Sequence, residues 1–193
     1  MKQATSFLCA VIVTILVVVG SPARANDVVI SADDSGKLLA LERKLSDFNG
    51  DSIARETAMF RRMQAKGLSL DVHALLCIQE MDIQLYSMLW ALNGAAVAAE
   101  MSASLMTNIK DESLALQVLE NALKTASKTS VSARSGMNDT LGKCSDNPLL
   151  YDKAKTLIGI IQEGSTLISP MLRKVQAAQA EHQYNVFNQR SAQ

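Results

Sequence analysis

The stretch that decides the fold is residues 71–108, which read DVHALLCIQE MDIQLYSMLW ALNGAAVAAE MSASLMTN. Apolar and small residues recur within it at alternating spacings of three and four: Ile78, Met81, Leu85, Met88, Leu92, Ala95, Ala99, Ser102 and Met106. This alternation is typical of the buried seam of a helix in a coiled-coil-like bundle. We therefore expect one helix over 71–108, roughly 57 Å long at 1.5 Å per residue.

The same spacing recurs on both sides of this stretch. It predicts an earlier helix from Ser35, a third helix starting at Asp111 or Glu112 with its stripe over 119–141, and a fourth starting at Pro148 with its stripe over 150–178. No proline lies between residues 26 and 147, which a strand-and-turn protein would rarely allow. Long helices joined by short loops fold back on their neighbours. The sequence therefore predicts an all-α, antiparallel up-down four-helix bundle.

Four positions mark expected breaks or ends of the predicted helices. The apolar phase of the first helix breaks at Asn49-Gly50, so we expect that helix to be bent or split near Gly50. Gly67 is the expected C-cap of the same helix, and Asp71 the expected N-cap of the next. Pro170 lies within the fourth helix and is expected to kink it.

The first 25 residues are typical of a secretory signal peptide. Lys2 precedes an apolar run over residues 7–19, and Ala23-Arg24-Ala25 follows it. The run is shorter than the roughly 20 residues of a spanning helix. We expect cleavage between Ala25 and Asn26, a mature chain without a transmembrane segment, and a periplasmic or secreted location. An uncleaved anchor is the alternative.

The mature chain is expected to form one domain with loose ends. Residues 26–34 predict a flexible lead-in, residues 35–184 the helical bundle, and residues 185–193 a frayed tail.

Two cysteines of the mature chain test this arrangement. If the second and third helices form a hairpin that turns between Lys110 and Asp111, facing residues have numbers that add to about 221. Cys77 and Cys144 meet this condition, and an exported protein folds in an oxidising compartment. We therefore predict a Cys77–Cys144 disulfide at the open end of the hairpin. Two separate thiols or a redox cysteine are the alternatives, although the chain has no C-x-x-C.

Charge and motifs exclude several classes of function. Lys and Arg number 19, as do Asp and Glu, so the chain lacks the positive excess of nucleic-acid binders and polybasic membrane binders. Only His73 and His182 are present, and no metal-ligating, haem-attachment, phosphate-loop or nucleophile-elbow motif is found. The sequence therefore predicts a protein that is not an enzyme and carries no cofactor.

Three weaker patterns suggest ligand chemistry. His182 is expected near Met101 and Met106, and a His and a Met on facing helices could hold a haem. The methionines of an exported protein could bind Cu(I), but most lie on the predicted seams, where core filling is favoured. Glu100 and Glu120 lie near each other across the predicted hairpin, and paired carboxylates can do acid–base work. Lys124, one turn from Glu120, favours instead a solvated i,i+4 ion pair.

The most unusual stretch is residues 91–99, ALNGAAVAA, where small residues cover more than one face of the helix. Tight internal packing opposite Ala122 and Ala126 is the favoured interpretation. The alternative is a docking surface formed by Trp90, Ala91, Ala95, Ala98 and Ala99. Trp90 and Tyr86 could edge a pocket or a partner surface, but core packing is favoured for both rings.

Taken together, these patterns favour an exported, non-enzymatic helical bundle that acts by binding a protein partner, itself or a cell-envelope component. The alternative is a periplasmic bundle that binds haem, copper or an apolar small molecule.

Overall fold

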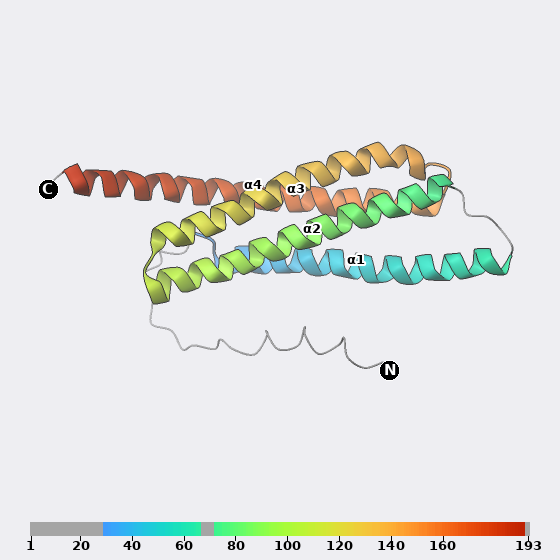
Figure 1. The fold of residues 1–193 in the computed structure, drawn as a ribbon, viewed down its shortest axis with the longest axis horizontal. Helices are drawn as coiled ribbons and strands as arrows, with labels where there is room; N and C mark the ends of the chain where they lie inside the picture. The colour runs from blue at the N-terminus through green and yellow to red at the C-terminus, as the bar shows by residue number, and fades with distance from the viewer. Residues whose placement is uncertain (1–28, 67–71, 192–193) are drawn as a thin grey trace.

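The computed structural model describes residues 29–66 and 72–191, and every secondary-structure element within these ranges is helical (Figure 1). The helices are α1 (Ala32–Ala65), α2 (Val72–Ser104), the π-helical turn η1 (Leu105–Ile109), α3 (Glu112–Cys144) and α4 (Pro148–Ser191). The four long helices pack against one another, which confirms the all-helical fold class. In Figure 1, α1 and α3 run from left to right, and α2 and α4 run from right to left.

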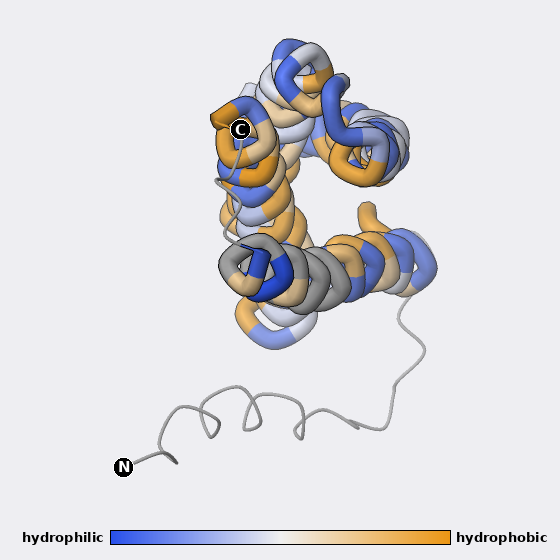
Figure 2. Tube along the Cα trace, turned by 90° about the vertical axis from the view of Figure 1, so that its right-hand side faces the viewer, coloured by the Kyte–Doolittle hydropathy of each residue, from blue (hydrophilic) through white to orange (hydrophobic). Residues whose placement is uncertain are grey.

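α2 and α4 each contact the other three long helices, whereas α1 makes no contact with α3 within the described residues. The contact between α2 and α3 is the most extensive. The predicted seam of α2 is buried from Ile78 to Ser102, and Met106 is half-buried. Viewed along the long axis, hydrophobic and hydrophilic residues lie on different sides of the helices (Figure 2). We call the buried seam of α2 the inner seam.

The predicted stripes are confirmed in α1 and α4. In α3 the stripe is confirmed at Leu119, Ala126, Ala133 and Met137 and is shifted by one residue at three other positions. Leu38, Leu41 and Leu45 of α1 are fully or almost fully buried, and so is the α4 stripe from Leu150 to Val175. In α3 the buried positions include Leu123, Ser130 and Thr140, each next to a predicted stripe residue: Ala122, Thr129 and Leu141. Ser130 and Thr140 tolerate burial because their hydroxyls donate to backbone carbonyls of their own helix.

A glycine lets α4 lie close to α1 and α2. A Cβ at Gly164 would lie 3.1 Å from Leu41 Cδ2 and 3.2 Å from Met88 Cε, so the absence of a side chain there leaves room for both neighbours. Gly164 is itself buried on the predicted α4 stripe. The predicted stripe residue is therefore small because two other helices occupy its space.

Local hydrogen bonds set where the helices begin. Ser31 caps α1: its Oγ accepts from the Asp34 amide at 3.1 Å, and the Asp34 carboxylate accepts from the Ser31 amide at 3.4 Å. This reciprocal pair is a capping box, so the predicted cap at Ser35 was wrong by one turn. Asp111 caps α3 by accepting from the Leu114 amide at 2.9 Å. Asn147 caps α4, with Pro148 in the first helical position.

Several expectations concern helix continuity and ends. α1 continues as one helix through Gly50, so it is not split there, and α4 continues through Pro170. A bend at Gly50 and a kink at Pro170 stay predictions. α4 also remains helical to Ser191, beyond residue 184 where fraying was expected to begin. The predicted signal peptide, its cleavage site at Ala25 and Asn26, and the caps Gly67 and Asp71 lie outside the described residues.

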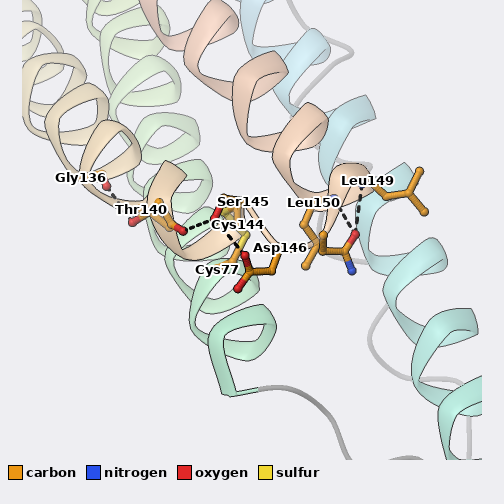
Figure 3. Close-up of a disulfide and its surroundings, with 10 residues drawn as sticks. Cys77, Gly136, Thr140, Cys144, Ser145, Asp146, Leu149 and Leu150 are labelled. Atoms are coloured by element: carbon orange, nitrogen blue, oxygen red, sulfur yellow. Dashed lines mark hydrogen bonds between the residues drawn. A yellow bond between two sulfur atoms is a disulfide. The ribbon is translucent and has the colours of Figure 1, made fainter.

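The Cys77–Cys144 disulfide is confirmed (Figure 3). The two Cα atoms are 5.3 Å apart, and both cysteines are fully buried. The turn lies where the register argument placed it, because Lys110 adopts a left-handed conformation with φ 58° and Asp111 begins the next helix. The hairpin therefore keeps one register from its turn to its open end.

We expect loss of the disulfide to lower stability without loss of helix. The bond closes a loop of 67 residues, which the chain-entropy model values at about 4 kcal/mol. Thermal unfolding of the Cys77→Ala, Cys144→Ala double variant, followed by far-UV circular dichroism, measures both quantities. Reduction of the wild type should reproduce the shift, and reductant should leave the double variant unchanged. A reduced wild type with an unaltered Tm would contradict this expectation.

The Asp34 carboxylate is expected to stabilise the fold in a pH-dependent way. Burial alone would raise the pKa of Asp34, but hydrogen bonds from Lys174 and Ser31 outweigh it and hold this pKa below the ordinary value of 3.8. Because the folded pKa is lowered, the stabilisation is present above the unfolded pKa and is lost as pH falls through the folded one. Asp34→Asn should cost about 1 kcal/mol at neutral pH.

Urea unfolding at several pH values checks the Asp34 prediction. The difference between Asp34→Asn and the wild type should shrink in acid, below about pH 4. Asp33→Asn is the matched control, because Asp33 is more exposed and pairs only with Lys37 of its own helix among the ion pairs found. Equal effects of the two substitutions at all pH values would rule out the special role of Asp34.

Candidate functional site

One face of α2 carries large apolar side chains that no other helix covers. Trp90 is 80% exposed and Tyr86 is 45% exposed, so the expected core packing of both rings was wrong. Further exposed apolar side chains follow the same face in both directions along the helix. We call this face the outer stripe, and it consists of Val72, Leu76, Ile83, Tyr86, Trp90, Val97 and Met101.

The outer stripe results from the unusual composition of α2. Residues 83–99 contain no Asp, Glu, Lys or Arg, so apolar and small residues surround the helix over nearly five turns. The members of the outer stripe are three, four or seven residues apart, so they share one side of the helix, and this side is opposite to the inner seam. A helix that is apolar all round is normally buried all round. Here one of its two apolar faces remains exposed in the single chain.

Shallow grooves flank the outer stripe on both sides. Towards α3, a groove of about 540 Å³ runs beside Trp90, lined otherwise by polar side chains and one alanine: Gln84, Ser87, Ala91, Thr125, Lys128, Thr129 and Ser132. On the other side, Tyr86 and Ile83 edge a groove of about 630 Å³ that also contains Asp82. Burial raises the pKa of Asp82, and the charge of Lys153 opposes this shift. The stripe is therefore a ridge bordered by one hydroxyl-rich and one apolar groove.

The alanines of the predicted docking surface point into the bundle. Ala95 is fully buried, and Ala91, Ala98 and Ala99 are each at most 9% exposed. They belong to the contact of α2 with its neighbours, as the packing interpretation of this stretch proposed. The four alanines of the predicted docking surface are therefore buried in the single chain, and Trp90 is its one member that lies at the surface. Five further residues of the same helix were not identified as exposed from the sequence: Val72, Leu76, Ile83, Val97 and Met101.

A second cavity lies where the α2–α3 turn meets α4. It has a volume of about 690 Å³, and both Met106 and His182 line it, as the haem hypothesis required. Met101 does not line it and is exposed on the outer stripe instead. His182 Nδ1 lies 3.2 Å from Glu112 Oε2, so this nitrogen faces a carboxylate. Charged side chains of both signs line the cavity, including Lys110 and Glu181.

Other candidate ligands turn out to be structural. Met81, Met88, Met137 and Met171 are buried, which confirms core filling for these four, while the side chains of Met59 and Met63 lie outside the described set. The Glu120 carboxylate lies 2.7 Å from Lys124 Nζ, which confirms the i,i+4 ion pair. That hydrogen bond from Lys124 lowers the pKa of Glu120.

No group of three or more His, Cys, Asp or Glu side chains within the described ranges is arranged to hold a metal ion. No helix in these ranges is long and apolar enough to cross a membrane.

Comparison of the chain with protein-family models, with curated proteins and with solved structures found no match in any of the three. The outer stripe is the most distinctive feature of the surface that the structure describes, and a function is inferred from it below.

Replacing Ala95 by Leu should destabilise the fold. The alanine is fully buried on the inner seam, and inserting three further carbons into a packed core typically costs ~1–3 kcal/mol. Urea unfolding measures this cost. Val97→Leu, two residues further along on the exposed face, is the control and should change stability by less than about 0.5 kcal/mol. Equal stability of Ala95→Leu and the wild type would mean that this side of α2 is not closely packed.

Proposed function

We propose that this chain is an exported, non-enzymatic protein that acts by binding a protein partner through the outer stripe of α2. Its scaffold would be an antiparallel up-down four-helix bundle. The observation that carries the proposal is Trp90, an 80%-exposed indole at the centre of an uncharged apolar face. Trp and Tyr dominate the binding energy of protein interfaces, because they bury a large area with few rotatable bonds.

The composition of the face favours a protein over the other binding classes. Contiguous exposed apolar side chains mark sites of association, since they are costly to leave in water. The charged residues that border the stripe on α2 are acidic, namely Glu80, Asp82 and Glu100, while Lys128 of α3 lines the groove beside Trp90 and Lys153 of α4 acts on Asp82. Such a mixed border lacks the excess of Lys and Arg with which proteins bind anionic lipid surfaces and nucleic acids. A protein surface is the class of partner that remains.

Export is supported by two independent features. The first 25 residues have the order of a secretory signal, with a positive start, a short apolar run and a small-residue cleavage motif ending at Ala25. The disulfide between Cys77 and Cys144 joins two buried sulfurs in the core, and such bonds persist in oxidising compartments. We therefore propose a periplasmic or secreted location.

A second candidate function is the binding of a small molecule in the cavity beside His182. It is favoured by one observation, that Met106 and His182 line the same space. Absorption spectra of the purified chain with added haem, and competition with a chromogenic chelator for added Cu(I), test it directly, and His182→Ala and Met106→Ala should each weaken binding. Chromophore binding that survives both substitutions would exclude this site.

The proposed function predicts that position 90 crosslinks to a protein. A photoreactive amino acid is placed at position 90 of the full chain, which is exported to the periplasm of a bacterial host and irradiated. The matched control carries it at Val131, a 63%-exposed apolar residue of α3. We expect a crosslinked protein, identified by mass spectrometry, from position 90 and little from position 131.

The possible outcomes separate clearly. A protein adduct at position 90 alone supports the proposed function, whether the adduct is another protein or a second copy of this chain. No adduct at position 90, or equal adducts at both positions, would contradict a docking role for the outer stripe.

A further inference from the structure

The second half of the outer stripe, together with Asn93 and Gly94 on the same face, has mirror-symmetric spacing. Tyr86, Trp90 and Asn93 precede the point between residues 93 and 94, and Gly94, Val97 and Met101 follow it at the same intervals. A helix with such spacing is complementary to itself when two copies run antiparallel. We infer that the partner is a second copy of this chain, with the two α2 helices paired about a two-fold axis at Asn93–Gly94. This inference rests on the proposed function.

The side chains that this pairing brings together are complementary in type. Trp90 faces the partner's Val97, and Tyr86 faces the partner's Met101, each twice because the interface is isologous. Aromatic rings pack favourably on aliphatic side chains and on methionine sulfur. The large side chains of one copy therefore meet smaller or more flexible ones of the other.

Gly94 lies at the position where the two helices would approach most closely. It is exposed in the middle of α2, and a Cβ built on it has nothing within 4 Å, so nothing in the single chain excludes alanine there. Glycine in a helix interior costs about 1 kcal/mol relative to alanine. Close backbone approach by a second helix is a physical reason for glycine at this position, because a side chain would hold the axes apart.

The charges at the edges of α2 favour this axis over a neighbouring one. With the axis at Asn93–Gly94, Glu100 lies opposite the partner's Ser87. An axis nearer Ala91 would bring Asp82 level with the partner's Glu100 on the same side of the helix pair, and like charges so placed repel.

The exposed apolar side chains supply a substantial part of the area that a dimer interface needs. Ile83, Tyr86, Trp90, Val97 and Met101 are between 45% and 80% exposed. At roughly 200 Å² for a large side chain, these fractions amount to roughly 500 Å². A standard interface buries about 800 Å² on each partner, and the polar residues beside the stripe supply further area.

Trp90 is the only tryptophan, so it reports on this interface directly. Sedimentation of the purified exported chain should give twice the chain mass at high concentration. Indole emission should shift to the blue and acrylamide quenching should fall as the concentration rises from nanomolar to high micromolar. Both changes should give the same midpoint, because dimerisation buries the indole.

Two substitutions and a matched control test the geometry. Gly94→Leu should weaken association about 100-fold, because it separates the helix axes at the two-fold axis. Val97→Glu should do the same by placing a charge against the partner's Trp90. Gly159→Leu is the control, because Gly159 is another exposed helical glycine with nothing within 4 Å, and it lies on α4. The circular dichroism and Tm of all three variants verify that they fold.

The outcomes distinguish this inference from the proposed function. A dimer that Gly94→Leu and Val97→Glu disrupt and Gly159→Leu leaves intact supports the inference. A chain that is monomeric at all concentrations, or a dimer that both α2 variants leave intact, overturns it. In that event, an adduct between position 90 and a different protein would still support the proposed function, whereas the absence of any protein adduct would overturn both.

Discussion

The burial of the inner seam of α2 is the constraint on which the rest of the structure depends. α2 contacts all three other long helices and makes its most extensive contact with α3, and its seam is continuous from Ile78 to Ser102. Its small residues allow α3 to lie close, and the disulfide at Cys77 fixes the register of that pair. With the α2–α3 hairpin fixed, α4 packs on both helices, and Gly164 leaves room for side chains of α1 and α2. Each further element is placed by its contact with this hairpin.

Sequence patterns predicted the buried stripes best where large apolar residues continue the three-and-four spacing without a break. The α2 and α4 stripes carry Leu, Ile or Met at most of their positions, and their buried positions were predicted almost residue by residue. The prediction was less accurate in α3, because Ser and Thr occur on both its buried and its exposed side: Ser130 is buried and Thr129 is not. A hydroxyl that bonds to its own helix can replace an apolar side chain in the core, and periodicity cannot detect this. The cap at Ser31 was missed because Asp34, whose side chain is one methylene shorter, takes the place of the usual Glu or Gln in the capping box.

The candidate site was missed for a different reason. Assigning the apolar residues of α2 to one seam left Trp90 and Tyr86 to be explained as core, although they do not lie on that seam. A helix with 17 consecutive uncharged residues, 83–99, has enough apolar surface for two seams. Counting the second set of three- and four-residue spacings would have identified the outer stripe from the sequence. What the sequence alone cannot decide is which of two such seams the other helices of the chain cover.

The end of α4 illustrates that helical geometry and helical stability are separate properties. The last turns extend past the α2–α3 connection in Figure 1, and Tyr184 and Phe187 are both about two-thirds exposed. An isolated helix of this length is marginal in water, because packing rather than propensity supplies most helical stability. Amide hydrogen exchange should therefore vary steeply along one unbroken helix. Amides near Val175 would exchange only when the whole bundle opens, while those near Ser191 would exchange by local opening.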